Sequence, residues 1–380
     1  MKLYEYEGIN LFQLEGIPVP DCAIVDTIEE AVEKAKEIGL PVVVKAQVLT
    51  GGRYLAGGVK TAETLEEVKN AASKIFTMSI RGMPVKKIMV VKKIDTVREF
   101  YLGVTVDEYH GSPVVILSPE GGVSINKTAQ ERPEGLSIRQ VPISKGLSLI
   151  DARNMCQDVK LVDKEFTEIS NILHRLYDLF RKYDAIVAEI NPLVRTAEGN
   201  YLAVDSKVEI DDSSLFRHKD LNLTWHDHLT NVLEQKGREI GVSYVELDGD
   251  IAVIASGAGL GMASVDIINR KLRAANFLET GGGISEELLY KVMGLVLDKP
   301  DIKGLFINVY GGINPIHEGA KGVVRYMKEF DVKIPVVAKA LGNRQEETWE
   351  IFESGGVHVV HDVSTEAGID MLTGILEGRR

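Results

Sequence analysis

The chain has 380 residues, of which 44% are hydrophobic and 26% charged, a composition typical of a globular protein with two or three domains. Its 44 basic and 56 acidic residues give a formal charge of −12, which argues against a nonspecific nucleic-acid binder because neutralising phosphates requires excess cations. The two cysteines, Cys22 and Cys156, lie far apart and show no spacing typical of a zinc site or a disulfide framework.

The N-terminal segment MKLYEYEGINLF carries acidic residues and has no apolar core, so we do not expect a signal peptide. No apolar run approaches the roughly 18 residues that a membrane span requires. The expected location is therefore the cytoplasm, with no membrane partner.

Local patterns predict the elements of the first part of the chain. Apolar side chains at helical spacing, with capping residues before them, predict helices over 26–39, 64–76 and 161–182. Runs of β-branched residues predict strands over 42–45, 87–91, 100–106, 113–117 and 185–190, and the last of these leads into a hairpin that returns through YLAVDSK.

The segment 42–60, VVVKAQVLTGGRYLAGGVK, is the most informative part of the sequence. A β-branched strand ends on Lys45, and a glycine-rich loop with Arg53 and Lys60 follows. Glycines let backbone N–H groups approach an anion closely, so this pattern predicts a nucleotide-phosphate site. The spacing is not that of a P-loop, and a turn without a ligand is the alternative. If the Lys45 ammonium meets only solvent or ligand, its removal should barely change stability.

The hairpin supplies oxygen ligands suited to Mg²⁺, which prefers one or two protein side chains together with phosphate and water. Glu189 and Asn191 stand two residues apart and therefore share a strand face. Asp205 is expected opposite them on the partner strand, and Pro192 interrupts the regular ladder after Asn191. The alternative is a polar cross-strand pair at the sheet surface.

After about Gly237, strands and helices alternate, which predicts a parallel, doubly wound sheet. Strands are expected at 251–255, 275–278, 304–309, 335–338 and 358–360, with helices beginning near 259, 285, 315, 345 and 365. Glycine turns follow four strands, at 256–261, 279–283, 310–314 and 341–343. Ligands bind at the carboxyl ends of such strands, so these turns indicate an anion or carboxylate crevice. Tight turns between strand and helix that bind no ligand are the alternative. No dinucleotide-binding GxGxxG with an acidic partner is present.

The chain resembles the β subunits of succinyl-CoA synthetases over essentially its whole length. The segments that carry the resemblance, in order, are MKLYEYEGINLF, VVKAQVLTGGRYLAGGVK, SPEGGVSI, AEINPLV, LAVDSK, DDSSLFRHKDL, LDGDIAVIASGAGLGMASVD, ANFLETGGG and INVYGGIN. The resemblance implies an α/β fold with an α+β N-terminal part. An ATP-grasp domain over 1–237, with two subdomains divided near 95, is expected to precede a flavodoxin-like CoA-ligase domain over 238–380.

The resemblance also implies roles for individual residues. Lys45 matches the family's phosphate-binding lysine, and Gly52, Arg53 and Tyr54 fall on its glycine loop. Val91, Ile94 and Glu99 fall among the family's nucleotide contacts. Asn191 and Asp205 match its Mg²⁺ ligands, and Glu189 matches the acid that meets a phosphohistidine on the partner α subunit. Ser256, Gly312, Ile313 and Asn314 match contacts to the organic acid. His317 is interpreted as a helix-start residue rather than a phosphohistidine.

Three departures from the family pattern bear on substrate identity. Tyr54 and Leu55 replace a glycine and a cation of GGRGKAGG, Val91 replaces an acid near the base or ribose, and Ser256 replaces the asparagine of NGAG. The choice between ATP and GTP, and the identity of the acid, therefore stay open.

The expected activity is that of the nucleotide-binding subunit of an acid–CoA ligase, with an α subunit that carries the phosphohistidine and the CoA site, as αβ or α₂β₂. Succinate is the leading acid, malate or another dicarboxylate is an alternative, and acetate is less favoured. Two further alternatives are a nucleotide-binding regulatory subunit that has lost phosphoryl transfer, and an ATP-grasp ligase that joins a carboxylate to an amine. The latter leaves the C-terminal part without a role.

Overall fold

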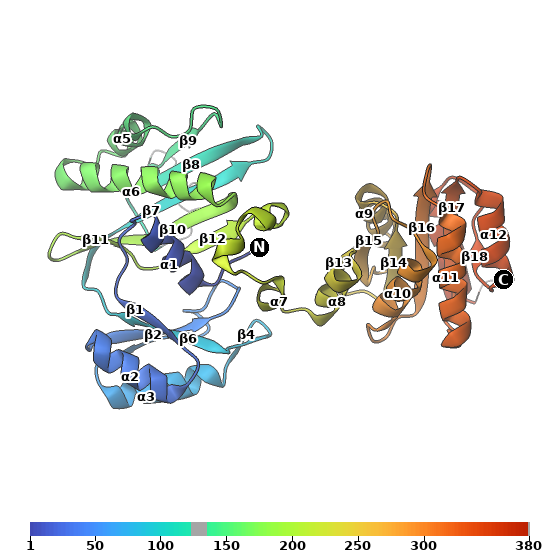
Figure 1. Cartoon of the computed structure of the whole chain (residues 1–380), viewed down its shortest axis with the longest axis horizontal. Helices are drawn as coiled ribbons and strands as arrows, with labels where there is room; N and C mark the ends of the chain where they lie inside the picture. Colours follow the sequence, from blue (N-terminus) through green and yellow to red (C-terminus); the bar gives the residue numbers. More distant parts are fainter. Residues whose placement is uncertain (123–134, 379–380) are drawn as a thin grey trace. The chain divides into compact units, whose positions relative to one another are not determined.

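The computed structural model describes residues 1–122 and 135–378. The chain forms two compact units, Met1–Thr224 and Trp225–Arg380, called unit 1 and unit 2 below (Figure 1). The domain boundary expected from the sequence, between 237 and 238, falls inside helix α8, Val232–Ile240. This helix packs against the first strand of unit 2, so it groups with that unit. Residues 123–125 of the motif SPEGGVSI lie outside the described residues.

The described elements of unit 1 are α1 (Glu5–Leu14), β1 (Cys22–Val25), α2 (Ile28–Ile38), β2 (Val42–Gln47), β3 (Val59–Ala62), α3 (Leu65–Phe76), β4 (Ser79–Ile80), β5 (Met83–Pro84), β6 (Lys87–Lys92), β7 (Thr96–Asp107), β8 (Ser112–Ser118), β9 (Ser137–Gln140), α5 (Leu149–Asp158), α6 (Asp163–Lys182), β10 (Ala185–Thr196), β11 (Tyr201–Ala203), β12 (Lys207–Ile210), η2 (Asp212–Arg217) and η3 (Lys219–Leu221). Those of unit 2 are α7 (Trp225–His228), α8, β13 (Ser243–Glu246), β14 (Ile251–Ala255), α9 (Ala258–Ile268), β15 (Asn276–Glu279), α10 (Glu286–Leu297), β16 (Gly304–Gly311), α11 (Ile316–Glu329), β17 (Val336–Gly342), α12 (Gln345–Ser354), β18 (His358–Val359) and α13 (Thr365–Leu376).

Unit 1 begins with an antiparallel sheet in the order β1-β6-β2-β3, covered by α2 and α3. The predicted helix starts are confirmed, because the Thr27 and Thr64 hydroxyls accept backbone N–H groups of Glu30 and Glu67 at 3.2 Å. Such caps satisfy donors at the helix start that lack an intrahelical partner. The buried faces of the two helices and the sheet form one apolar cluster that includes Val42, Val44 and Ile75.

A second antiparallel sheet follows in the order β11-β10-β7-β8-β9, with β12 also paired to β10. Strands β11 and β12 both run along β10, to residues 193–195 and 185–189, and the chain between them leaves the ladder at 204–206. The pairing of β10 with β7 shifts register between Ile190 and Leu193, on the same stretch of β10. The regular ladder is therefore interrupted on the stretch of β10 that carries Asn191 and at the 204–206 segment.

Unit 2 confirms the predicted doubly wound sheet. Its strand order is β13-β15-β14-β16-β17-β18, and the parallel strands in chain order read 2-1-3-4-5, the flavodoxin-like arrangement. Alternate residues of β14 face opposite layers: Ile251 and Val253 pack with α9 and α13, while Ala252 and Ile254 pack with α10, α11 and α12. The antiparallel edge strand β13 was not predicted, because its four residues carry little periodic signal.

In the described part of the chain, no helix combines the length and apolarity that crossing a bilayer demands.

Candidate nucleotide-phosphate and metal site

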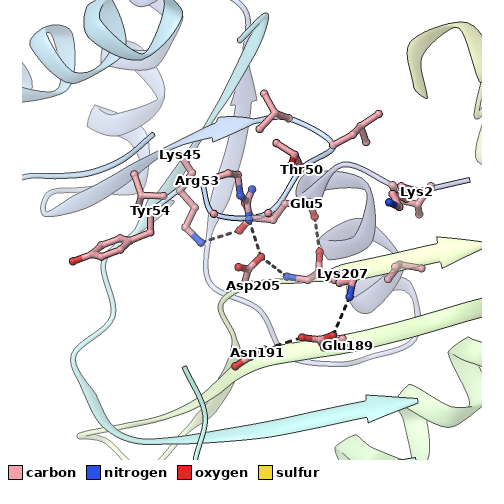
Figure 2. A pocket seen from close by; sticks show the side chains of 18 of the residues that line it. Lys2, Glu5, Lys45, Thr50, Arg53, Tyr54, Glu189, Asn191, Asp205 and Lys207 are labelled. Atoms are coloured by element: carbon pink, nitrogen blue, oxygen red, sulfur yellow. Dashed lines mark hydrogen bonds and ion pairs between the residues drawn. The ribbon is translucent and has the colours of Figure 1, made fainter. Parts of the chain in front are cut away.

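A pocket of 680 Å³ in unit 1 gathers the charged residues singled out in the sequence (Figure 2). The predicted site residues that line it are Lys45, Gly52, Arg53, Tyr54, Glu189, Asn191 and Asp205. They come from β2, from the glycine loop after it, and from β10 with the 204–206 segment. The pocket therefore brings the lysine loop and the hairpin oxygens together, as the sequence predicted. It also contains charged residues that the prediction did not include: Lys2, Glu5, Arg81, Lys207 and Glu209.

Lys45 reaches from β2 towards the hairpin. Its ammonium lies 2.8 Å from a Glu5 carboxylate oxygen and donates to the Val204 carbonyl oxygen at 2.7 Å, and its side chain is 13% exposed. The condition under which removal of Lys45 would barely change stability is not met, because Glu5 and Val204 hold its ammonium. This contact places the Lys45 ammonium beside Val204, the residue that precedes Asp205.

Arg53 projects from the glycine loop into the same cluster. Its guanidinium pairs with Glu5 and, at 3.0 Å, with Asp205. The loop is closed on itself by the Gly58 N–H, which donates to the Arg53 carbonyl at 2.8 Å, and Gly52 adopts φ +82°, a conformation that favours glycine. Tyr54 and Leu55 lie on the outside of this turn, 77% and 91% exposed.

Glu5 is the central anion of the cluster, and the sequence analysis missed it. Burial by itself would raise the pKa of the Glu5 carboxyl, but Lys45, Arg53 and the hydrogen bond from Gln47 together lower it below its ordinary value. Glu5 is therefore ionised at neutral pH. In the sequence, Glu5 looks like an ordinary acidic residue at the start of a helix, where such residues are common. No local pattern pairs it with a lysine 40 positions away.

The hairpin oxygens lie near one another. The Asn191 amide nitrogen is 3.5 Å from a Glu189 carboxylate oxygen, whose partner oxygen lies 3.5 Å from the Lys207 ammonium. Asp205 was expected on the strand opposite Asn191. It lies instead in the break between β11 and β12, where its Oδ1 accepts the Ser206 N–H at 2.8 Å. Leaving the ladder lets the Asp205 carboxylate turn towards Arg53 and the pocket.

The donor set fits the Mg²⁺ that the sequence predicts. Asn191 and Asp205 offer an amide and a carboxylate oxygen to the same pocket, beside two cations that suit polyphosphate. In the described part of the chain, no group of three or more His, Cys, Asp or Glu side chains is arranged to hold a metal ion. Two protein ligands are enough for a Mg²⁺ ion whose other ligands are phosphate oxygens of a bound nucleotide and water. Burial and the Glu5 charge raise the pKa of the Asp205 carboxyl to about 6, although Arg53 and Lys45 oppose the shift.

Three further predicted nucleotide contacts do not line this pocket. Val91 is buried in β6 between Cys22 and Val43, and Ile94 is half-buried after the end of β6. Glu99, on β7, contacts the glycine pair Gly121–Gly122. Its backbone carbonyl accepts the Gly121 N–H at 3.0 Å. The next N–H, of Gly122, donates to the Asn191 side chain at 2.9 Å. A Cβ at Gly122 would lie 2.2 Å from the Glu99 carboxylate, so only glycine allows this approach.

The predicted acid contacts lie in unit 2, at the carboxyl ends of β14 and β16, where the strand order reverses. The Ser256 hydroxyl accepts the Tyr310 N–H at 2.9 Å and lies 3.2 Å from the Tyr310 carbonyl, so it ties the ends of the two strands together. Gly312, Ile313 and Asn314 form the next turn, in which Ile313 is 95% exposed. His317 follows in the first turn of α11, as the sequence predicted.

Comparisons with known proteins decide the family. An ATP-grasp domain matches residues 2–195 and a CoA-ligase domain matches residues 254–369. The chain is 40% identical to the β subunit of the GDP-forming succinate–CoA ligase of Thermus thermophilus, over 97% of each chain. It is 36% identical to the ADP-forming β subunit of Aquifex aeolicus, over 95% of each. The chain belongs to the succinate–CoA ligase β-subunit family.

A solved structure shares the fold of this family member over its whole length. The ATP citrate lyase of Methanothrix soehngenii, in complex with citrate and coenzyme A, superposes with a TM-score of 0.76 and covers 99% of both chains at 18% identity. At that identity the likeness concerns the fold alone. The succession of an ATP-grasp domain and a CoA-ligase domain, which the sequence predicted, rests on the two domain matches.

Proposed function

We propose that this chain is the β subunit of a nucleoside-diphosphate-forming succinate–CoA ligase, which binds a Mg²⁺-nucleotide and exchanges its terminal phosphate with a phosphohistidine on an α subunit. The single observation that carries the proposal is the convergence of Lys45, Arg53 and the hairpin oxygens on one pocket in a chain of this family. A nucleotide-binding regulatory subunit would have no need of an intact oxygen set.

The residues divide the work of phosphoryl transfer. Lys45, Arg53 and the N–H groups of the glycine loop would hold the phosphate oxygens, and preorganised donors of this kind stabilise charge that moves in the transition state. Asn191 and Asp205 would hold Mg²⁺, which when bound neutralises charge on the terminal phosphates. Glu189 would face the phosphohistidine of the α subunit. Burial, with a smaller contribution from the Glu189 carboxylate, raises the pKa of the neighbouring Tyr101 phenol, which therefore stays protonated beside Glu189.

The partner would complete the reaction. In this proposal the α subunit brings the phosphohistidine and the CoA site, while the turn at Gly312, Ile313 and Asn314, with Ser256, contributes to binding the dicarboxylate. Acid activation then proceeds by transfer of the phosphoryl group to the carboxylate and attack of the CoA thiol on the acyl phosphate, with release of phosphate. Reconstitution of this chain with an α subunit would also show whether the assembly is αβ or α₂β₂ and whether ATP or GTP is preferred.

The test is reconstitution with an α chain of the family. We expect no acid-dependent consumption of ATP or GTP by this chain alone and a clear gain when the α chain is added, with succinate preferred over malate, citrate and acetate. Full activity of the isolated chain would contradict the division of labour, and binding of nucleotide without turnover by the reconstituted pair would favour a regulatory subunit. Preference for malate would retain the reaction class and change the substrate.

A further inference from the structure

The buried Glu5 carboxylate lines the pocket, to which the four-stranded and the six-stranded sheets of unit 1 both contribute residues. Glu5 is 3% exposed, and its two oxygens receive Lys45 at 2.8 Å, Gln47 at 3.3 Å and the Arg53 guanidinium. Lys45 and Gln47 belong to β2 of the first sheet, whereas Arg53 belongs to the glycine loop. One carboxylate therefore fixes the strand lysine and the loop arginine relative to each other (Figure 2).

The backbone that carries Glu5 is itself anchored on both sides. The Tyr6 N–H donates to the Gln47 side-chain oxygen at 3.2 Å, which ties the start of α1 to β2. The Ser206 hydroxyl donates to the Glu5 carbonyl at 2.8 Å, which ties the same turn to the break beside Asp205. Gly8 permits this closeness, because a Cβ there would lie 2.4 Å from the Ser206 hydroxyl oxygen. The start of α1 therefore holds β2 and the 204–206 segment together.

Charge alone would argue against an anion at this position. Lys45 and Arg53 are the cations that would hold phosphate, and the Glu5 carboxylate lowers the positive potential that a polyphosphate meets. Because Glu5 weakens the positive potential and still contacts both cations, any benefit to phosphate binding must come from the positions in which it holds them. Without a partner, the long side chains of lysine and arginine would sample several rotamers, and ordering them on binding would reduce affinity.

We propose that Glu5 is a positioning residue for nucleotide binding: it preorganises the Lys45 ammonium and the Arg53 guanidinium so that both face the phosphate side of the pocket. This inference rests on the proposed function, since it needs a nucleotide in the pocket. It makes a prediction with a definite sign. Positioning predicts weaker nucleotide binding when the Glu5 charge is removed, whereas the electrostatic effect alone predicts tighter binding.

The experiment measures dissociation constants of MgATP and MgGTP by titration calorimetry on the full chain. The Glu5→Gln variant keeps the shape of the side chain, and we expect its Kd for the preferred nucleotide to rise at least about tenfold, in keeping with the effect of supporting residues around metal sites. Glu5→Asp restores the charge on a shorter side chain and should raise Kd by less. Thermal unfolding of each variant reports the folded fraction. If Glu5→Gln does not fold, the Kd of Glu5→Asp carries the test.

Glu165 offers a matched control within unit 1. Its residue exposure is 8%, and it pairs with Arg98 at 2.6 Å and Arg195 at 2.9 Å, but it does not line the pocket. Glu165→Gln should lower stability and leave both nucleotide Kd values within about twofold. An unchanged or lower Kd in folded Glu5→Gln or Glu5→Asp would overturn the positioning role. Failure of the unchanged chain to bind either nucleotide would instead overturn the proposed function, and this inference with it.

Discussion

Units 1 and 2 each carry a strand lysine in nearly the same local sequence, and they place it in different surroundings. Pro41–Ala46 reads PVVVKA and Pro335–Ala340 reads PVVAKA, and both segments form strands, β2 and β17. Lys45 faces the Glu5 carboxylate and a pocket. Lys339 is 7% exposed, and its ammonium lies 3.4 Å from the Asn308 side-chain oxygen, with no carboxylate within ion-pair distance among the described residues.

The difference follows from the sheets. Strand β2 belongs to an antiparallel sheet, one face of which is covered by helices while the other reaches the pocket. Strand β17 lies between β16 and β18 in a parallel sheet with helices on both faces, so its lysine is largely buried. Burial accordingly lowers the pKa of Lys339, although Asp362 and Glu366 oppose the shift. The comparison teaches that similar strand sequences bring a lysine to an anion and a pocket only where the sheet leaves one face free of helices.

The largest effect that tests this comparison is expected at Lys45. Lys45→Ala should lower turnover of the reconstituted enzyme by on the order of 100-fold or more, because a preorganised donor to the moving charge is lost. Stability should also fall, by about 1–3 kcal/mol, because the buried Glu5 carboxylate loses one of its partners. Steady-state kinetics and urea unfolding measure the two effects. A variant with full stability would contradict the pairing of Lys45 with Glu5.

The metal dependence of the pocket should respond next. Asp205→Asn replaces a carboxylate with a neutral amide, so the Mg²⁺ concentration that gives half-maximal nucleotide binding should rise by about tenfold or more. Titration of Mg²⁺ at fixed ATP and GTP measures this shift. Asp211→Asn, at an exposed site where Asp211 caps the Ser213 N–H at 2.9 Å, is a control expected to leave the Mg²⁺ requirement unchanged. If both variants need the same Mg²⁺ concentration for half-maximal nucleotide binding, Asp205 is not a Mg²⁺ ligand.

Lys339 gives a pH signature of its own. Because its folded-state pKa lies below the ordinary value of 10.5, the unfolded chain binds more protons between the two values, and this term makes stability rise with pH across that window. Below the folded-state pKa the full cost of the buried charge is present. We expect Lys339→Met to be at least as stable as the unchanged protein at pH 7.

The measurement is urea unfolding of both proteins at pH 7 and at pH 10. The stability of the unchanged protein relative to Lys339→Met should increase as pH rises towards 10.5. A constant difference between the two proteins would show that Lys339 titrates alike in the folded and unfolded chains.

The smallest effect is expected in the glycine loop. Tyr54 is 77% exposed and faces away from the Glu5 cluster, so Tyr54→Gly, which restores the residue usual in the family, should change the free energy of unfolding by less than about 0.5 kcal/mol. Its nucleotide Kd should stay within about threefold, since the loop contributes backbone N–H groups to phosphate. Calorimetry with MgATP and MgGTP checks this. A large loss of affinity would assign a direct contact to the Tyr54 ring.

Much of this architecture was readable from local patterns. The caps at Thr27 and Thr64, the strand that ends in the Lys45 loop, and the alternation of unit 2 each follow from signals that lie within a few residues of one another. The edge strand β13 was too short to be detected, and Asp205 was placed on a strand because nothing local announces the break between β11 and β12. The carboxylate of Glu5 was missed because its partners lie 40 and 48 residues away.

The sequence by itself determined the family, the order of the two fold types and several of the residues that line the pocket, because residue types, spacing and periodicity are local properties. The tertiary structure alone decided which of two similar lysines meets an anion, and that the start of α1 supplies this anion. It also showed that Ser256 joins two strand ends through Tyr310. Contacts of this kind depend on how distant segments pack, and a one-dimensional pattern carries no record of the distance between them.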